Sequence, residues 1–371
     1  MELEDISFHQ LNPFLEFDQT MRIWQSIEKN AANSFYLSWV WMENWLSCLS
    51  SEDKVIFVFG EHKNKPVFCY FLGLKKGVDS KITYCNRAYL NGTGDFNKDA
   101  ITIEQNGILI DKAFGESNLS SVFQKASTWD ELVARFLSPD QIKYFSQGSS
   151  HLNLRIEDED KAFYVDLEQV RNSNNDLLPL LSKNKRSQIR RSIKAYEKVG
   201  PIKIEFATNP ADAKACFTEL QTLLQERQKQ KYGEDYPISD FASKFHERLI
   251  AKYCARESVD LVTVFAGDCV IGHLYNFIDE EGVYFNQCGF EYRPENVYRP
   301  GLVCHLLLIN HYASLGYPKY DFMVGEMDYK KSLSSGSYAM PTYRLRKNKI
   351  RFKIEDMVRK AKRDLSEYRT K

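Results

Sequence analysis

The hydrophobic pattern of the second half of the chain predicts a small sheet followed by one helix. Apolar runs of strand length are followed by a helical pattern over Gly301–Leu315, which Gly316 and Pro318 bring to an end. The strands expected in this half are Ile202–Ala207, Leu261–Phe265, Val270–Ile278, Val283–Gly289 and Tyr320–Val324. Further helices are expected over Leu177–Lys198, after Asn209-Pro210, and over Ser239–Arg256.

The first half has a similar pattern, with a helix ahead of a run of strands. The helix is expected over Phe35–Leu49, and a second one over Thr128–Phe136. The expected strands are Val55–Phe59, Pro66–Gly73, Ile82–Leu90, Ala100–Ile103, Gly107–Ile110 and Ala162–Leu167. Helices that alternate with short strand runs in both halves indicate an α/β (α+β) protein in which two mixed, mostly antiparallel sheets are flanked by helices.

Length and charge refine this picture. With 371 residues the chain has room for two domains, which we expect over residues 1–160 and 161–343. Its formal net charge is zero, but residues 344–371 carry twelve Lys/Arg against four Asp/Glu, so we expect a basic helical tail there. The acidic start of the chain and the lack of a long apolar run predict a cytoplasmic protein that does not insert into a membrane.

The cysteine pattern gives no sign of a metal centre. The eight cysteines include no CxxC pair, and most lie in apolar runs, where a free thiol behaves as a small hydrophobic group. We therefore expect reduced cysteines and no bound metal. Cys288 as a nucleophile would need a histidine partner, and none lies close in sequence.

The junction Arg299-Pro300-Gly301 is the first candidate for ligand binding. Pro300 suits the first turn of a helix because it has no amide hydrogen to leave unpaired. The N-terminus of a helix offers free amide hydrogens and a positive dipole end, which together bind phosphate. Arg299 adds a cation, and Gly301 lets a ligand approach the backbone. The strand ahead of it, Asn286-Gln287-Cys288-Gly289, would form the other side of such a donor site.

A polar cluster follows the last strand of this unit. Asp321 and Glu326 are candidates for the general base, and Tyr329 and Lys330 for donors to a developing negative charge. A surface loop with ordinary ion pairs is the alternative interpretation.

Substrate-binding candidates lie on the helices ahead of the strands. Arg186 and Arg190 share one face of a basic helix that also carries Lys183 and Lys194. That face could meet phosphates or an anionic sugar, although a solvated surface is the simpler interpretation. Arg227 and His246 could line the acceptor side of a cleft.

These residues resemble the bacterial acetyltransferase domain known as CelD-like or BioF-type, which is related to the FemAB peptidyltransferases. The resemblance covers most of residues 30–335 and is densest after residue 180. It is carried by Leu181–Arg186, Arg190-Arg191, Leu224–Arg227, Phe245-His246, Arg299–Gly301, Tyr320–Phe322, Gly325-Glu326 and Tyr329-Lys330. It implies two tandem GNAT-like domains and a tail that returns to the first half.

The resemblance implies an N-acyltransferase that takes an acyl group, in the simplest case acetyl, from acyl-CoA as a co-substrate. The implied acceptor is an amine such as an amino sugar of a cell-surface polysaccharide precursor. Two alternatives stay open. One is a FemAB-like peptidyltransferase that uses aminoacyl-tRNA. The other is a catalytically silent GNAT-like scaffold for polysaccharide assembly, since Arg299 and Gly301 are all that remain of the glycine-rich pyrophosphate loop typical of the superfamily.

Overall fold

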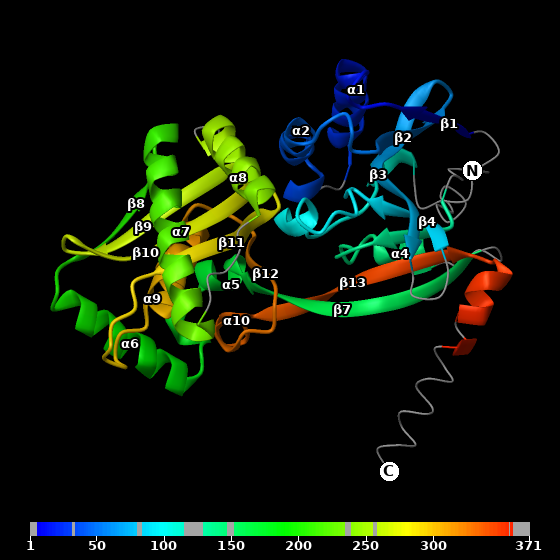
Figure 1. Ribbon diagram of the computed structural model, residues 1–371. Helices are drawn as coiled ribbons and strands as arrows, with labels where there is room; N and C mark the ends of the chain where they lie inside the picture. The colour runs from blue at the N-terminus through cyan, green and yellow to red at the C-terminus, as the bar shows by residue number, and fades with distance from the viewer. Residues whose placement is uncertain are drawn as a thin grey trace, which may run out of the picture. The chain divides into compact units, whose positions relative to one another are not determined.

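The computed structural model divides the chain into two compact units (Figure 1). Unit 1 comprises Met1–Asp160 and Met340–Lys371, and unit 2 comprises Lys161–Ala339. The structure describes residues 6–31, 34–79, 84–114, 129–146, 152–233, 239–254, 258–355 and 357–358. Two long strands, β7 (Leu152–Asp166) and β13 (Gly336–Lys347), each contribute residues to both units.

Unit 2 contains a mixed sheet with the strand order β7-β12-β11-β10-β9-β8. All neighbours pair antiparallel except β11 and β12, which run parallel. The strands of this unit are β8 (Ile202–Phe206), β9 (Val259–Ala266), β10 (Cys269–Asp279), β11 (Gly282–Phe290) and β12 (Lys319–Val324). A crossover connection that contains a helix, residues 300–314, joins β11 to β12, because two parallel strands cannot be joined by a tight hairpin turn.

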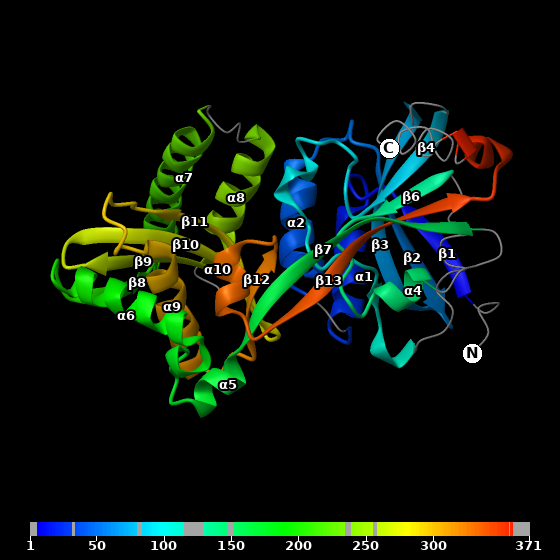
Figure 2. The ribbon, with the colours of Figure 1, turned by 90° about the horizontal axis from the view of Figure 1, so that it is seen from below.

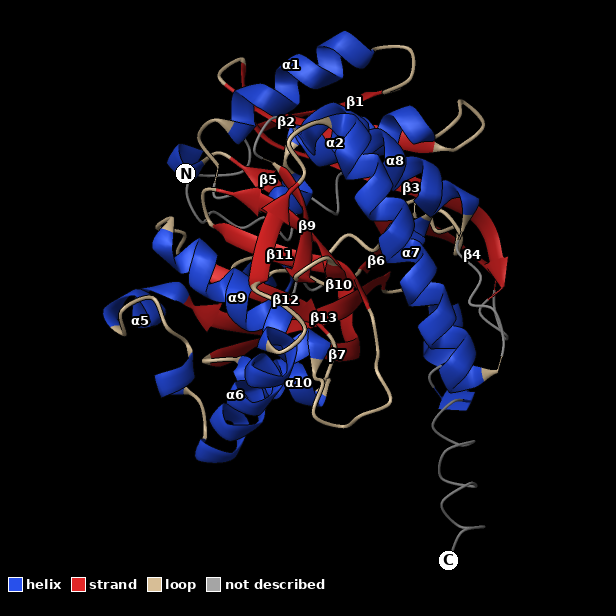
Figure 3. Cartoon of the chain, turned by 90° about the vertical axis from the view of Figure 1, so that its left-hand side faces the viewer, coloured by secondary structure: helices blue, strands red, loops and turns tan. Residues whose placement is uncertain are grey.

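Helices cover both faces of this sheet (Figure 2). Helices α7 (Pro210–Tyr232) and α8 (Asp240–Tyr253) lie side by side on one face (Figure 3). Helices α5 (Leu167–Asn172), α6 (Lys183–Glu197) and α9 (Pro300–Ser314) cover the other. The short helix α10 (Asp328–Leu333) follows β12.

Helix α9 joins β11 to β12 and owes its limits to local sequence. Pro300 occupies its first turn. At the other end, Gly316 takes the left-handed conformation (φ +91°), and the amide of Tyr317 donates to the carbonyl of Tyr312 at 3.3 Å. This is the pattern of a helix ended by glycine.

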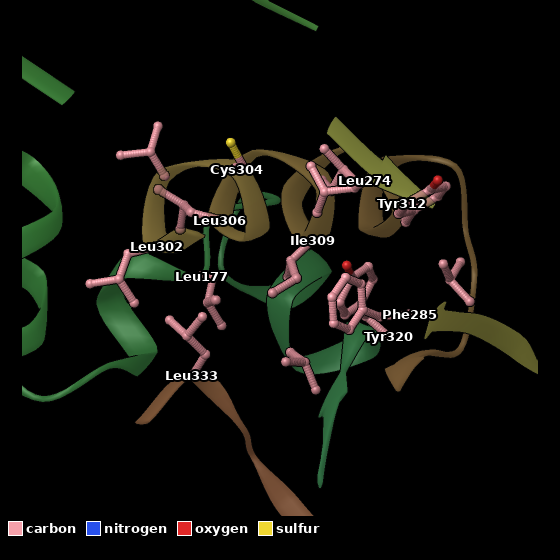
Figure 4. Close-up of a cluster of buried hydrophobic side chains, with 14 of the residues drawn as sticks. Leu177, Leu274, Phe285, Leu302, Cys304, Leu306, Ile309, Tyr312, Tyr320 and Leu333 are labelled. Atoms are coloured by element: carbon pink, nitrogen blue, oxygen red, sulfur yellow. The ribbon is translucent and has the colours of Figure 1, made fainter. Parts of the chain in front are cut away.

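Helix α9 also supplies much of the hydrophobic core of unit 2. Figure 4 shows it lying over side chains from other segments, among them Leu177, Phe285 and Tyr320. Leu306 and Ile309 are buried on the same helix. Because burial of this kind is the main favourable term in folding, α9 is held firmly and its N-terminus has a fixed position in the unit.

Unit 1 contains a second sheet with strand order β1-β2-β3-β4-β6-β13, and β5 pairs with β3. Its other strands are β1 (Ile6–Leu11), β2 (Val55–His62), β3 (Lys65–Asp79), β4 (Tyr84–Leu90), β5 (Leu109–Ile110) and β6 (Glu131–Ala134). Its helices include α1 (Phe17–Glu28), α2 (Trp39–Cys48) and α4 (Ile142–Ser146). Trp24 of α1 stacks on Phe71 of β3, with ring centroids 5.1 Å apart.

The two units have the same strand order. In each, four antiparallel strands are followed by a parallel neighbour and then by an antiparallel one: β1-β2-β3-β4-β6-β13 corresponds to β8-β9-β10-β11-β12-β7. This confirms the α/β class expected from the sequence, with mostly antiparallel sheets flanked by helices.

Several local predictions were wrong. The helix expected over Thr128–Phe136 is wrong, because Glu131–Ala134 form strand β6. No strand forms over Ala100–Ile103, where the chain makes a 3-10 turn at Asp99–Ile101. The helix expected over Leu177–Lys198 begins only at Lys183, after a separate 3-10 turn. The start of the strand expected over Ile82–Leu90 and the end of the helix expected over Ser239–Arg256 fall outside the described residues.

The C-terminal region differs from the expected tail in two ways. Residues 344–347 belong to strand β13 rather than to a helix, and residues 340–343 belong to unit 1 rather than to the second domain. Residues 350–355 are helical. The predicted tail beyond residue 358 lies outside the described residues.

Candidate functional site

The central feature of unit 2 is the point at which the parallel strands β11 and β12 separate. They pair only at Val283 with Tyr320 and at Tyr284 with Asp321. Beyond this point Asn286 forms a bulge in β11, because Gln287 and Phe285 pair with consecutive residues of β10.

Strand β12 departs from regular geometry at the same level. Its register with β7 shifts between Asp321 and Val324, and Met323 adopts a φ of +60°. Gly325 follows with a φ of +124°, a value that glycine tolerates and other residues rarely adopt. Bulges re-aim a strand and end its pairing, so the two strands diverge and leave an opening between them.

A cleft of about 730 Å³ occupies this opening. A cavity of this size is in the range of small-molecule and cofactor sites. Strand β11 and the following loop provide one wall, α9 a second, and α7 and α10 the others. The lining residues are Leu223, Leu224, Arg227, Phe285, Asn286, Gln287, Cys288, Phe290, Tyr292, Arg293, Glu295, Asn296, Tyr298–Leu302, Val324, Met327, Tyr329 and Lys330.

The N-terminus of α9 forms one end of the cleft. Val303 is the first residue whose amide reaches a helical acceptor, the carbonyl of Arg299 at 3.1 Å. The amides of Gly301 and Leu302 precede it and therefore have no acceptor within the helix. Arg299, at the N-cap position, makes no side-chain capping hydrogen bond. This end of the cleft thus presents amide donors at the positive end of a helix dipole.

Arginines surround the same end. Arg299 and Arg293 lie in the segment between β11 and α9, and Arg227 lies on α7. The guanidinium of Arg293 lies 4.8 Å from the ring centre of Tyr298, and that of Arg227 lies 4.2 Å from that of Tyr292. A guanidinium at this distance from an aromatic ring is attracted to it, and the N–H donors of Arg suit phosphate and carboxylate groups. The cleft therefore suits an anionic ligand.

The other end of the cleft contains Tyr329 and Lys330, both on α10. Lys330 is 6% exposed, and its Nζ donates to the carbonyl oxygens of Val324 at 2.6 Å and Met323 at 3.4 Å. The distorted end of β12 thus holds the ammonium group at the cleft wall. Tyr329 stacks on the buried ring of His305, with centroids 5.3 Å apart and planes 13° apart. Burial raises the pKa of the Tyr329 hydroxyl, which therefore stays protonated at neutral pH.

The thiol of Cys288 lies on the same wall. Burial raises its pKa to about 12, and the positive charge of Lys330 opposes this only in part. A thiol with such a pKa is protonated at neutral pH and is a weak nucleophile. The structure accordingly places Cys288 in the cleft as a neutral lining group.

Eight of the expected site residues meet in this cleft: Arg227, Asn286, Gln287, Cys288, Arg299, Gly301, Tyr329 and Lys330. Gln287 accepts a hydrogen bond at 2.6 Å from Gln221 of α7. An added Cβ on Gly301 would lie 3.1 Å from the ring of Phe290, so even alanine there would crowd the cleft wall.

Asp321 does not line the cleft. It lies fully buried within β12 and accepts hydrogen bonds from the amide of Met323 at 2.9 Å and the hydroxyl of Tyr338 at 2.8 Å. Lys319 pairs with it at 3.5 Å. Burial raises the pKa of this carboxyl, against the opposing effects of Lys319 and the hydrogen bonds. These contacts fix the distorted end of the strand, which is a structural role.

Glu326 also lies outside the cleft. It is exposed and forms an ion pair with Lys331 at 2.6 Å. Among the described residues that line the cleft, Glu295 is the only carboxylate, and it is exposed. Both carboxylates that the sequence offered as the general base therefore lie outside the cleft lining, whereas Lys330, offered as a donor, is part of it.

Four other expected residues serve packing or the outer surface. Gly289 lets α7 approach β11, because an added Cβ would lie 2.4 Å from the carbonyl oxygen of Leu220. His246 is buried on α8 beside the hydroxyl of Tyr275 (3.3 Å), and burial lowers its pKa to about 4. Arg186 and Arg190 lie on α6, outside the cleft lining.

Sequence reasoning missed Arg293 and Tyr292, which line the cleft. Both belong to the loop between β11 and α9, where no periodic pattern marks a residue as important. The signal that could have found Arg293 is the number of cations next to a helix start: Arg293 and Arg299 lie seven residues and one residue ahead of Pro300.

The corresponding position in unit 1 is closed. There β4 and β6 pair in parallel from Arg87 to Tyr89, and the side-chain amide of Asn106 bonds to the carbonyl of Leu90 at 3.0 Å. The Asn106 backbone also pairs with the chain beyond β6, since its amide donates to Phe136 O at 2.8 Å. The cavity that remains is about 30 Å³, room for a single water molecule.

Neither a metal site nor a membrane-spanning helix is found among the residues that the structure describes. None of them form a group of three or more His, Cys, Asp or Glu side chains placed to hold a metal ion. In the same part of the chain, no helix combines the length and the apolar character needed to cross a bilayer.

These features define a protein of two topologically equivalent α/β units, of which the second has an open, cationic cleft between diverging parallel strands. Residues 183–331 match the family model described as "Acetyltransferase (GNAT) domain". This stretch, which lies within unit 2, is thus similar to the GNAT acetyltransferase domain, in agreement with the sequence resemblance. No curated protein matches the sequence.

The solved structure of FemX extends the fold similarity to most of the chain. FemX is 12% identical, with 91% of this chain and 96% of FemX covered and a TM-score of 0.56. A tandem GNAT protein from the clavulanic acid biosynthesis pathway is 10% identical, with 92% and 98% covered and a TM-score of 0.45. The C-terminal DUF2156 domain of a putative lysylphosphatidylglycerol synthetase from Agrobacterium fabrum is 10% identical, with 92% and 95% covered and a TM-score of 0.49. At 12% identity, the similarity to FemX supports the fold and not an activity.

Proposed function

We propose that the protein is an N-acyltransferase that moves an acyl group, in the simplest case acetyl, from acyl-CoA to an amine. One observation carries the proposal. The cleft of unit 2 has a helix N-terminus with arginines at one end and a buried lysine with a protonated tyrosine at the other, within the residues that match the GNAT domain.

The donor site lies at the α9 end. The amides of Gly301 and Leu302 and the cation of Arg299 suit the pyrophosphate of coenzyme A. Arg293 adds a further cation for its remaining phosphate. From there the pantetheine arm follows β11 past Asn286, whose bulge leaves backbone groups without a partner on β12. The thioester then lies beside Tyr329 and Lys330.

The chemical step is attack of a neutral amine nitrogen on the thioester carbonyl carbon. A C–N bond forms, the electron pair of the carbonyl moves to its oxygen, and its return breaks the C–S bond. The ammonium group of Lys330 stabilises the negative charge on the acyl oxygen. The hydroxyl of Tyr329 donates its proton to the departing thiolate, and the proton lost by the amine returns to Tyr329 through water in the open cleft.

This mechanism assigns no proton transfer to Asp321 or Glu326, because neither lines the cleft. The amine must therefore enter in its neutral form. We expect the rate at limiting amine to rise with pH and to level off near the pKa of the acceptor, with no inflection from a carboxylate of the enzyme.

The acceptor in this proposal is an amino sugar, as the sequence resemblance implied. Tyr292 at the cleft mouth is 45% exposed and carries Arg227 against one face of its ring. An exposed aromatic face packs well against the C–H face of a sugar ring, and the guanidinium edge can bond sugar hydroxyls.

Donor binding is the first test. Calorimetry and thermal shift with acetyl-CoA, free CoA and tRNA are expected to show binding of the two CoA compounds. A ligand at 100 times its Kd stabilises a protein by about 2.7 kcal/mol. Arg299→Ala should weaken acetyl-CoA binding about tenfold, the lower end of the range for a charge-assisted hydrogen bond. Arg190→Ala, which removes an exposed cation outside the cleft, is the matched control.

The results against the proposal are equally definite. If neither acetyl-CoA nor CoA binds, the donor assignment is wrong. If tRNA binds in their place, the aminoacyl-tRNA alternative replaces it. If acetyl-CoA binds and Arg299→Ala has no effect, the donor lies elsewhere on the chain.

A further inference from the structure

Helix α6 carries a stripe of cations along its exposed side. At 100° per residue, Lys183, Arg190, Arg191, Lys194 and the C-cap residue Lys198 fall within an arc of about 100°. All five are exposed. None of the five forms an ion pair in the described structure; the one hydrogen bond among them runs from Arg191 to the carbonyl of Ser187 at 3.4 Å. We call these five residues the α6 stripe.

The opposite side of α6 fixes the direction in which the stripe points. Ile189, Ser192 and Tyr196 are buried on that side, and α6 packs on α9. Glu197 is the only acidic residue of the helix. Because the inner side is anchored in the core, the stripe is a permanent cationic surface of unit 2.

Helix α6 also borders the cleft. The hydroxyl of Ser192 accepts a hydrogen bond from the amide of Arg299 at 2.9 Å, directly ahead of the first turn of α9. The guanidinium of Arg293, which lines the cleft, lies 5.9 Å from the ring centre of Tyr196. Helix α6 therefore lies between the stripe, on its outer side, and the cleft, so that the two are separated by about one helix diameter of 10–12 Å.

The composition of this surface distinguishes between polyanions. Nucleic-acid surfaces of this kind combine cations with exposed aromatic rings on which bases stack, whereas the one aromatic residue of α6, Tyr196, is buried. Two exposed apolar side chains instead flank the helix, Leu180 (47% exposed) before it and Val199 (36% exposed) after it. A cluster of about four to eight Lys and Arg on one exposed side of a helix is a pattern of anionic-lipid binding.

We propose that the α6 stripe is a docking surface for the anionic face of a lipid bilayer. Lipid phosphates would pair with the five cations, and Leu180 and Val199 would enter the headgroup region. The proposal goes beyond acyl transfer and does not depend on it. If both hold, the bilayer presents acceptors that carry a lipid anchor close to the cleft.

The test is sedimentation of the full chain with lipid vesicles. Vesicles of neutral phosphatidylcholine are compared with vesicles in which 30% of the lipid is phosphatidylglycerol, at 50 and 300 mM NaCl. We expect binding to the anionic vesicles only, and weaker binding at high salt because the Debye length shortens. Since each cation near such a surface adds about a factor of five, the triple variant Lys183→Glu/Arg190→Glu/Lys194→Glu should bind at least 100-fold more weakly.

A matched variant controls for total charge. Lys214, Lys231 and Lys244 are exposed lysines on α7 and α8, on the other face of the sheet. Replacing all three with Glu changes the net charge equally and should alter vesicle binding by less than threefold. A thermal melt confirms that both triple variants are folded.

Three results would overturn the proposal. The first is equal partitioning of the unmodified chain into neutral and anionic vesicles. The second is an equal loss of binding in both triple variants, which would mean that only net charge matters. The third is binding of a 20-nucleotide RNA through the stripe without binding to vesicles, which would assign the surface to nucleic acid.

Discussion

Replacing Lys330 with methionine removes one ammonium group from the cleft and keeps the length of the side chain. Lys330 is 6% exposed, and its Nζ donates to the carbonyls of Val324 and Met323. Methionine fills the same space without either hydrogen bond. The substitution therefore separates the charge at this position from its packing.

Two effects of known size follow. Leaving a buried carbonyl without its donor costs about 1–3 kcal/mol, which lowers Tm by roughly 2–4 °C per kcal/mol in a domain of this size. Loss of one group that stabilises the oxyanion typically lowers kcat by about 10²–10³. The effect on the rate is much larger than the effect on the folded fraction, because a domain stable by about 5–15 kcal/mol remains folded after such a loss.

The assay is release of the CoA thiol from acetyl-CoA in the presence of a panel of amino sugars. For Lys330→Met we expect kcat to fall at least 100-fold, while the Kd of acetyl-CoA changes less than threefold. Lys331→Met is the matched control, because the adjacent lysine is half-exposed and pairs with the exposed Glu326. A surface pair of this kind contributes at most about 1 kcal/mol, and its loss should leave kcat unchanged.

The reasoning fails if folded Lys330→Met binds acetyl-CoA and turns over at the rate of the unmodified protein. In that case the donor site would stand and the assignment of charge stabilisation to Lys330 would be wrong. An equal loss in Lys331→Met would show instead that the kinetics respond to the total charge of α10.

Three further predictions follow from other parts of the structure. Calorimetry should find one acetyl-CoA per chain, because Asn106 and its neighbours close the corresponding opening in unit 1; two sites per chain would contradict this. Gly289→Ala should destabilise the protein by at least about 1–3 kcal/mol in urea unfolding, since the added Cβ would lie 2.4 Å from the carbonyl oxygen of Leu220, whereas Gly92→Ala, whose nearest contact is 3.4 Å away, should be tolerated. Burial raises the pKa of Asp279 to about 6, above the value of about 3.9 in an unfolded chain, so the folded state holds this proton more tightly. Its contribution to stability is complete below about pH 4 and is lost as the pH rises towards 6, by up to about 1.4 kcal/mol per pH unit. Asp279→Asn should lack this dependence, and identical pH profiles for the two proteins would refute it.

Helix α9 and its neighbours could be predicted because their signals are local. Pro300 marks the start of the helix, Gly316 and Pro318 its end, and the strands on either side are short runs of mostly apolar residues. Nothing in these signals depends on a distant part of the chain. For the same reason the phosphate-binding end of the cleft, at Arg299 and Gly301, could be proposed from the sequence.

Strand β6 shows why other elements could not be predicted. Its four residues are all buried, so it lacks the alternation that marks a half-buried strand. Glu131 is fully buried within it and is neutralised by Arg87, Arg344 and Arg346. Two of these arginines come from β13, more than two hundred residues later. A buried charge with partners so distant looks from the sequence like the polar face of a helix.

The same dependence on distant residues decides which side chain enters the cleft. From the sequence, Asp321 is a carboxylate at the end of a strand and therefore a natural general base. In the structure, that carboxylate binds the hydroxyl of Tyr338 from β13, the ammonium group of Lys319 and the amide of Met323. The chain turns sharply at Met323. The turn brings Lys330 back to the carbonyls of Met323 and Val324. Asp321 thus acts by fixing the turn that positions Lys330, so Asp321→Asn should lower activity only as far as it displaces the lysine.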